Sequence, residues 1–204
     1  MIKNIIFDMG NVLIKFDKKL FLAAVNVPPE DSELLEREVY MSVEWAMMDR
    51  GTLTEKQAAE IMCARLPERL HETIHKLVDE WDRPMLPIDG MAELVGELKN
   101  NGYRIFLLSN ASYRQHEYWP DIPGSKYFDD TLISADVKLV KPQPEIYLMA
   151  LHKFGAKADE SVFIDDATNN VEGAVYCGLK GIVFHGDSGE LRRKLKAMGV
   201  NCRI

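Results

Sequence analysis

Apolar residues gather in five short runs along this chain. The first run begins at Ile5 and ends at Asp8, and the later runs occupy residues 103–109, 131–134, 161–165 and 181–184. Short runs without regular polar alternation are typical of strands that are buried on both faces of a parallel sheet. The pattern therefore predicts five strands.

Helical patterns alternate with these runs from residue 88 onward. A helix is expected at residues 91–100, because Asn101 and Gly102 form a good C-terminal signal directly after it. This alternation predicts an α/β fold, a doubly wound parallel sheet with helices on both faces. Ligands bind such sheets at the carboxyl ends of the strands.

Residues 17–84 have a different character, because they contain no convincing strand. Helical patterns are expected at residues 31–48, 54–65 and 68–81. The segment Thr52–Glu55 places a hydroxyl just before the second of them with Glu55 close behind, which is a reasonable helix start. We therefore predict an α/β core made of residues 1–16 and 85–204. A helical insert, residues 17–84, follows the first strand at the rim where ligands bind.

Composition excludes several classes of partner. The 204 residues carry a net charge of −7, which gives no electrostatic case for binding nucleic acid or an anionic membrane. No apolar run approaches membrane-spanning length, and no signal peptide is recognised. Cys63, Cys177 and Cys202 are widely spaced and odd in number, which suits a reducing compartment and predicts neither a disulfide framework nor a zinc site. A cytoplasmic protein is expected, and its oligomeric state stays open.

Chemically distinctive residues follow four of these segments. Asp8 ends the first strand, Ser109 and Asn110 end the second, Lys141 precedes a Pro-x-Pro turn, and Asp165 and Asp166 end the fourth. They supply a carboxylate nucleophile, a hydroxyl donor, a fixed cation and an acidic pair for a metal. This set is suited to Mg²⁺-assisted phosphoryl transfer through an aspartyl-phosphate.

The segments FDMGNVLI, LLSN, KPQPEIY and FIDDATNNVEGA, in this order, resemble the haloacid dehalogenase (HAD) superfamily. Within it they are most similar to small sugar-phosphate phosphatases, including α-D-glucose-1-phosphate phosphatases. The resemblance implies a Rossmann-like core with strand order 5-4-1-2-3, and a mobile cap formed by residues 17–84. It also implies that the Gly10 carbonyl joins Asp8, Asp165 and Asp166 around Mg²⁺.

The remaining site residues are expected to bind the substrate. Ser109 and Asn110 would donate to a phosphoryl oxygen, and Lys141 would neutralise phosphate and orient Asp8. Asn170 would hold either the loop of the acidic pair or a metal-bound water. Trp45, His116, Tyr118 and Trp119 are candidates for lining the pocket, with ordinary packing as the alternative, and Asn11 is a further candidate beside the nucleophile.

Several tempting residues are interpreted as structural. Lys138 competes with Lys141 for the cation role but is read as a solvated loop lysine. His71 and His75 have the i, i+4 spacing of a metal pair, yet no third ligand accompanies them. The insert also contains three methionines, which are interpreted as packing within it: Met41, Met47 and Met48.

Gly10 departs from the family pattern. Most phosphatases of the superfamily have a second Asp at this position, as general acid for the leaving alcohol and then as base for water. Three accounts stay open: a group from the cap or the Asn11 region substitutes, water relays the proton, or the leaving group needs little help. The third account favours a sugar 1-phosphate, because an anomeric hydroxyl is more acidic than an ordinary alcohol.

The sequence thus predicts a Mg²⁺-dependent phosphatase that acts on a small phosphorylated metabolite, with a lean to a sugar 1-phosphate. One alternative is a metal-independent hydrolytic dehalogenase, which the Asp165–Asp166 pair disfavours, because adjacent carboxylates without a cation repel each other. The other is a non-catalytic protein that keeps the fold for regulation or binding. The presence of Asp8, Ser109 and Lys141 disfavours that alternative.

Overall fold

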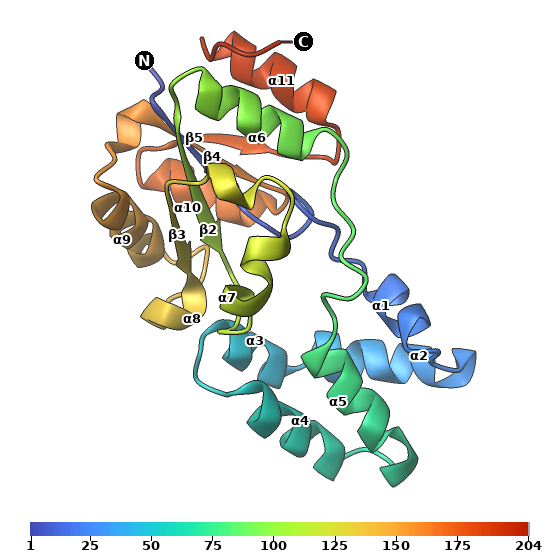
Figure 1. The fold of residues 1–204 in the computed structure, drawn as a ribbon. Coiled ribbons are helices and arrows are strands. Elements are labelled where there is room, and N and C mark those ends of the chain that lie inside the picture. Colours follow the sequence, from blue (N-terminus) through green and yellow to red (C-terminus); the bar gives the residue numbers. More distant parts are fainter. Residues whose placement is uncertain (204) are drawn as a thin grey trace.

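The core of the computed structural model, which describes residues 1–203, is a five-stranded parallel sheet (Figure 1). Its strands are β1 (Asn4–Phe7), β2 (Arg104–Ser109), β3 (Asp130–Ile133), β4 (Ser161–Asp165) and β5 (Lys180–Val183). Their spatial order is β3-β2-β1-β4-β5. The predicted order 5-4-1-2-3 is the same order read from the other edge, so the prediction is confirmed.

The register of the strands places the carboxyl-terminal parts of β1, β2 and β4 side by side. Phe7 of β1 lies beside Leu107 of β2 and Ile164 of β4. The Asp8 amide continues this ladder by donating to the Ile164 carbonyl at 2.8 Å. The carboxyl ends of the three central strands therefore meet at one edge of the sheet.

Helices cover both faces of the sheet (Figure 1). Ile5 and Phe7 pack on the side of α6 (Met91–Asn100) and α11 (Ser188–Ala197), whereas Ile6 packs on the side of α9 (Pro144–Phe154) and α10 (Thr168–Tyr176). Alternate residues of a strand point to opposite faces, so the all-apolar β1 serves both layers. Helix α6 confirms the helix expected at residues 91–100.

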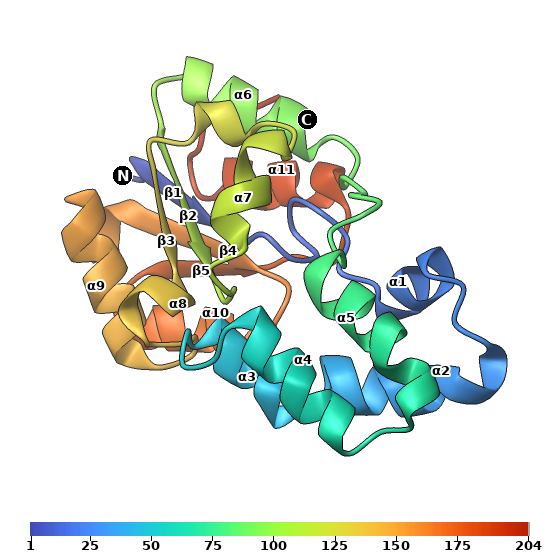
Figure 2. The ribbon, with the colours of Figure 1, turned by 60° about the horizontal axis from the view of Figure 1, so that its bottom comes forward.

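A second lobe of helices stands at the carboxyl ends of the strands (Figures 1 and 2). It contains α1 (Lys18–Ala24), α2 (Pro29–Leu35), a π-helical turn (Glu36–Tyr40), α3 (Val43–Asp49), α4 (Glu55–Ala64), a 3-10 turn (Glu68–Leu70) and α5 (His71–Asp79). Helix α4 begins at Glu55, within the predicted segment, and its start is a reciprocal capping box formed by Thr54 and Gln57.

The single helix expected at residues 31–48 is wrong. Helix α2 passes into the π-helical turn, and the chain then bends at Met41 and Ser42. The Ser42 hydroxyl accepts a hydrogen bond from the Trp45 amide at 3.1 Å, which starts α3 as a separate helix. Helix α1 had no counterpart in the predicted elements.

Two neighbouring segments join this lobe to the sheet. The Lys15 amide donates to the Leu86 carbonyl at 2.8 Å, and the Ile88 amide donates to the Leu13 carbonyl at 2.9 Å. The outgoing and returning chains thus run side by side in opposite directions. Apolar residues of the lobe belong to the same packed cluster as the α6 face of the sheet.

Short elements complete the remaining loops. They are α7 (Gln115–Tyr118), α8 (Ser134–Val137), and the 3-10 turns Trp119–Asp121, Ser125–Tyr127 and Ala158–Glu160. Within residues 1–203, no helix is both long and apolar enough to cross a membrane.

Candidate active site

Lys141 is the centre of the candidate site. Its ammonium donates to Asp8 Oδ1 and to Asp165 Oδ2, each at 2.7 Å, and to the Leu108 carbonyl at 3.1 Å. The side chain of Lys141 is 1% exposed. The site therefore joins the ends of β1, β2 and β4 to the loop that precedes α9.

Burial and neighbouring charges shift the pKa values of Asp8 and Lys141 in opposite directions. Burial raises the pKa of Asp8 above its ordinary value, although the Lys141 ammonium opposes the rise. Burial disfavours the charged form of Lys141, but the carboxylates of Asp8 and Asp165 outweigh it and hold the pKa of Lys141 above its usual range. One buried cation is thus shared between two buried carboxylates.

Asp166 provides a third carboxylate beside this pair. Oxygen atoms of Asp8, Asp165 and Asp166 lie within 4.8 Å of one another. Burial raises the pKa of Asp166, while a hydrogen bond from the Asn11 amide, 3.0 Å long, opposes the rise. Three carboxylates against one ammonium leave negative charge that a hard divalent cation would neutralise, so the residues present fit Mg²⁺.

The two members of the acidic pair have different surroundings. Asp165 is fully buried, and its oxygens accept from Lys141, the Ala167 amide and the Asn170 side chain. Asp166 instead lines a cavity, together with Asp8 and Gly10. The Asn170 side-chain amide donates to Asp165 Oδ1 at 3.1 Å. Of the pair, only Asp166 therefore faces the space where a ligand would bind.

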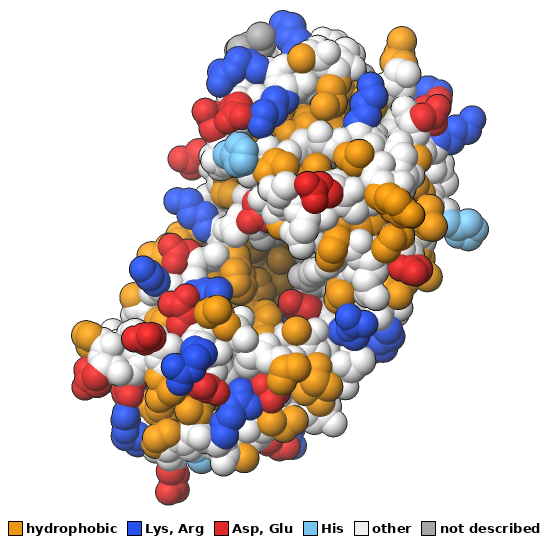
Figure 3. All heavy atoms as spheres, turned by 180° about the vertical axis from the view of Figure 1, so that it is seen from behind, with side chains coloured by type: hydrophobic (Ala, Val, Ile, Leu, Met, Phe, Trp, Pro, Cys, Tyr) orange, Lys and Arg blue, Asp and Glu red, His pale blue; other side chains and the backbone are white. Residues whose placement is uncertain are grey.

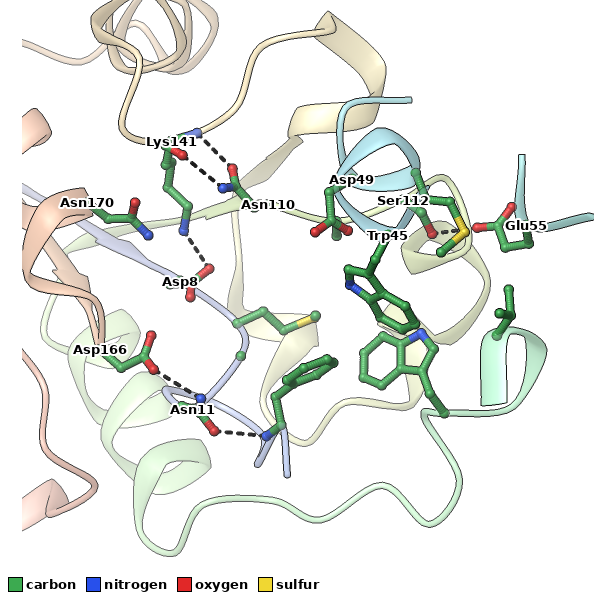
Figure 4. A pocket seen from close by; sticks show the side chains of 17 residues that line it. Asp8, Asn11, Trp45, Asp49, Glu55, Asn110, Ser112, Lys141, Asp166 and Asn170 are labelled. Atoms are coloured by element: carbon green, nitrogen blue, oxygen red, sulfur yellow. Dashed lines mark hydrogen bonds and ion pairs between the residues drawn. The ribbon is translucent and has the colours of Figure 1, made fainter. Parts of the chain in front are cut away.

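The two residues that are predicted to donate hydrogen bonds to phosphate differ in their position. Asn110 donates to the Lys141 carbonyl at 3.1 Å and accepts from the Lys141 amide at 2.8 Å, so its side chain fixes the Lys141 loop (Figure 4). Asn110 also lines the cavity, whereas Ser109 is 1% exposed and does not line it. Within residues 1–203, the Ser109 hydroxyl makes no hydrogen bond.

The cavity has a volume of about 190 Å³ and lies between the strand ends and the helical lobe. One wall is apolar and is formed by Met9, Phe16, Trp45, Met48, Val78 and Trp81. Polar groups lie beside this wall, and they belong to Asp49, Glu55 and Ser112 (Figure 4). The surface is also hollowed between the two lobes on the face shown in Figure 3, with hydrophobic side chains in the hollow.

Trp45 lines the cavity, as expected of a substrate-binding residue. The other three aromatic and histidine candidates do not line it: His116, Tyr118 and Trp119. His116 is exposed, and its Nε2 lies 3.0 Å from Asp136 Oδ1, so the structure does not bring it to the cavity. Tyr118 packs on Trp81, and Trp119 packs on Phe128.

Three further interpretations can be compared with the structure. Lys138 is exposed, as expected of a loop lysine, and its ammonium also donates to the Gly51 carbonyl and to the Tyr113 hydroxyl. Met41 and Met47 are 65% and 36% exposed, so they do not pack inside the lobe, while Met48 forms part of the cavity wall. Asn11 lines the cavity, but its side chain binds Asp166 and the Phe16 amide.

Asp49 and Glu55 are cavity residues that the sequence analysis missed. Burial raises the pKa of Asp49 to about 8, although the Lys141 charge opposes the rise. Glu55 accepts a hydrogen bond from the Ser112 hydroxyl at 2.5 Å. No local sequence signal marks these carboxylates, because each lies on an ordinary amphipathic helix.

Three comparisons place these features among known proteins. The family model described as haloacid dehalogenase-like hydrolase matches residues 2–178. The phosphorylated carbohydrates phosphatase of Thermotoga maritima is 24% identical over 181 residues, which cover 87% of this chain and 82% of that protein. Drimenol cyclase drtB of Aspergillus calidoustus is 24% identical over 200 residues, or 96% of this chain, yet the chain spans only 36% of that relative's length.

Solved structures share the fold. A HAD family enzyme of Bacteroides thetaiotaomicron, in complex with magnesium and inorganic phosphate, has a TM-score of 0.71 at 21% identity, over 94% of this chain and 99% of that one. L-2-haloacid dehalogenase of Xanthobacter autotrophicus has a TM-score of 0.67 at 17% identity, over 98% and 84% of the two chains. At these identities the likeness concerns the fold alone.

Proposed function

Because the chain belongs to the haloacid dehalogenase-like hydrolases, we propose that it is a Mg²⁺-dependent phosphatase of a small phosphorylated metabolite. The observation that supports this most is the cluster of Asp8, Asp165 and Asp166 around one buried lysine, opening onto a cavity. A phosphoryl group brings several negative charges, and a site with one ammonium and room for a divalent cation is suited to them.

We assign the metal to the carboxylates of Asp8 and Asp166 and to the Gly10 carbonyl, because these groups face the cavity. A bound Mg²⁺ would neutralise charge on the phosphoryl oxygens. Asp165 stays in the acidic group, but its hydrogen bonds to Lys141 and Asn170 suit it to holding the lysine in place.

Each remaining residue has a role in this proposal. Asp8 attacks phosphorus and forms the aspartyl-phosphate, and Lys141 orients Asp8 and balances the charge of the phosphoryl group. Ser109 donates its hydroxyl to a phosphoryl oxygen at the end of β2. Asn110 fixes the Lys141 loop through the Lys141 peptide, which keeps the ammonium beside the nucleophile.

The cavity supports a sugar phosphate as the substrate. Trp45 and Trp81 offer aromatic surface to the apolar face of a sugar ring, and Glu55 and Ser112 offer hydrogen-bonding groups for its hydroxyls. A sugar 1-phosphate is our preferred class of substrate, because its anomeric hydroxyl is more acidic than an ordinary alcohol and leaves phosphorus with the least demand on any proton donor.

Phosphate release from a panel of metabolites, with and without a chelator, tests the proposal. We expect a higher kcat/KM for glucose 1-phosphate than for glucose 6-phosphate, and loss of both activities in the chelator. Asp8→Asn should lower turnover by at least about 1,000-fold, because a covalent nucleophile is lost. Halide release from a 2-haloacid in excess chelator, without phosphate release, would instead support the dehalogenase alternative.

A further inference from the structure

The strand-end residues leave one chemical role empty. An alcohol that leaves phosphorus needs a proton, and the water that follows must lose one. Gly10 has no side chain, although a Cβ built there would meet only Phe16 Cβ, at 3.8 Å, so space is not the obstacle. Both polar atoms of the Asn11 side chain are already bonded, to Asp166 and to the Phe16 amide.

Asp49 projects into the same cavity from the opposite side. It is the last residue of α3, and its side chain points into the cavity across from Asp8 and Lys141 (Figure 4). Within residues 1–203, its carboxylate has no hydrogen-bond or ion-pair partner. Glu55, the other acid from the helical lobe in this cavity, is held by the Ser112 hydroxyl.

The backbone around Asp49 is fixed to the α/β core. The Ser134 hydroxyl, at the start of α8, donates to the Asp49 carbonyl, and the Lys138 ammonium donates to the Gly51 carbonyl. Gly51 has a φ of +70°, and a Cβ there would lie 2.5 Å from the Ala135 carbonyl oxygen. The free carboxylate is therefore carried on a backbone segment that is tethered to the α/β core through α8.

We propose that Asp49 is the general acid and base of the reaction, supplied by the helical lobe in place of the side chain that Gly10 lacks. This inference rests on the proposed phosphatase function. In-line displacement places the leaving oxygen on the side of phosphorus opposite Asp8. Asp49 enters the cavity from that side, so one carboxyl group can serve the leaving alcohol and the water that replaces it.

The two steps balance in atoms and protons. In the first, an Asp8 oxygen forms a bond to phosphorus, the bond from phosphorus to the alcohol oxygen breaks, and the proton of Asp49 moves to that oxygen. In the second, water attacks phosphorus, its proton returns to Asp49, and the bond from phosphorus to Asp8 breaks. The products are the alcohol, phosphate and the original enzyme.

The protonation state of Asp49 agrees with this role. Burial raises its pKa to about 8, so the group holds a proton at neutral pH. Lys141 opposes the rise, while Asp8 and Glu55 add to it, and the buried Tyr118 of α7 is a further titratable neighbour. An acid that is protonated near neutrality is suited to general acid catalysis.

Asp49→Asn tests the proposal with two esters, 4-nitrophenyl phosphate and glucose 6-phosphate. A nitrophenolate leaves without a proton, whereas a sugar alkoxide does not. We expect kcat/KM for glucose 6-phosphate to fall at least about 100-fold, and kcat/KM for the aryl ester to change only a few-fold. The variant should also release a rapid stoichiometric burst of nitrophenol, because hydrolysis of its aspartyl-phosphate lacks a base.

Glu60→Gln is the control, since it alters an exposed carboxylate of the same helical lobe that does not line the cavity. It should leave kcat/KM for both esters unchanged and give no burst. Equal losses for both esters in Asp49→Asn, or no loss, would overturn the assignment of Asp49. Absence of phosphate release by the unaltered protein from every ester would instead overturn the proposed function itself.

The pH profile of the unaltered protein gives a measurement that needs no variant. For glucose 6-phosphate, kcat/KM should fall as pH rises through the pKa of Asp49, because the proton donor is lost. For the aryl ester this limb should be absent. Identical profiles for the two esters would overturn the proposal.

Discussion

At the scale of single residues, Lys141 carries the electrostatics of the site. Two buried carboxylates, Asp8 and Asp165, depend on its ammonium, and each contact is 2.7 Å long. Removing one partner of a buried ion pair leaves an uncompensated charge, which costs far more than the pair contributes. The lysine is therefore required for stability as well as for chemistry.

Lys141→Met should consequently lower the free energy of unfolding by about 3 kcal/mol or more in metal-free buffer. Lys153→Met is the control, because Lys153 forms an exposed pair with Asp130 and should cost less than about 1 kcal/mol. Urea unfolding in the presence of a chelator measures both values. Equal losses in the two variants would contradict the central role of Lys141.

At the scale of elements, the contact between α3 and α8 sets the position of the cavity wall. Gly51 lies at this contact with a φ of +70°, close against Ala135. Gly102 has a similar φ of +89°, but a Cβ there would meet nothing within 4 Å. The two glycines therefore differ in crowding and not in backbone strain.

Gly51→Ala and Gly102→Ala should separate these effects. Both variants bear the cost of a left-handed alanine, of the order of 1 kcal/mol. Only Gly51→Ala should displace α3 from α8, which moves Asp49 and lowers kcat/KM for phosphate esters by at least about 10-fold. Steady-state kinetics and thermal unfolding measure the two outcomes, and equal kinetics in both variants would show that this contact does not position the site.

At the scale of the whole molecule, the helical lobe and the sheet enclose the site jointly. The lobe is joined to the core by two adjacent segments, near Lys15 and Leu86, and these suit a hinge. We treat residues 17–84 as a cap whose docking completes the cavity. Binding of Mg²⁺ at the strand ends should stabilise the folded chain by mass action.

Thermal unfolding should therefore respond to magnesium even without a substrate. At a Mg²⁺ concentration about 100 times the Kd, the stabilisation is about 2.7 kcal/mol, which raises Tm by about 5 °C or more. Asp166→Asn should abolish this rise, whereas Asp136→Asn, an exposed carboxylate beside His116, should keep it. An unchanged rise in Asp166→Asn would remove Asp166 from the metal site.

Local sequence patterns were enough to predict the sheet and the order of the chemical groups along it. Apolar runs that end in Asp8, Ser109 and Asp165 are local features, and parallel register carries their ends to one edge of the sheet. The meeting of Asp8, Lys141 and the acidic pair could be predicted for this reason. The strand order needed the family resemblance in addition.

The residues that enclose the cavity could not be predicted in this way, because they meet through tertiary packing. Asp49 and Glu55 lie on separate helices, and their approach to Asp8 depends on how those helices dock, which no local pattern encodes. His116 was misplaced for the same reason, because the turn of α7 after β2 sets its direction. Residues that follow a strand end inherit their position from the sheet, whereas residues across a cavity take theirs from long-range packing.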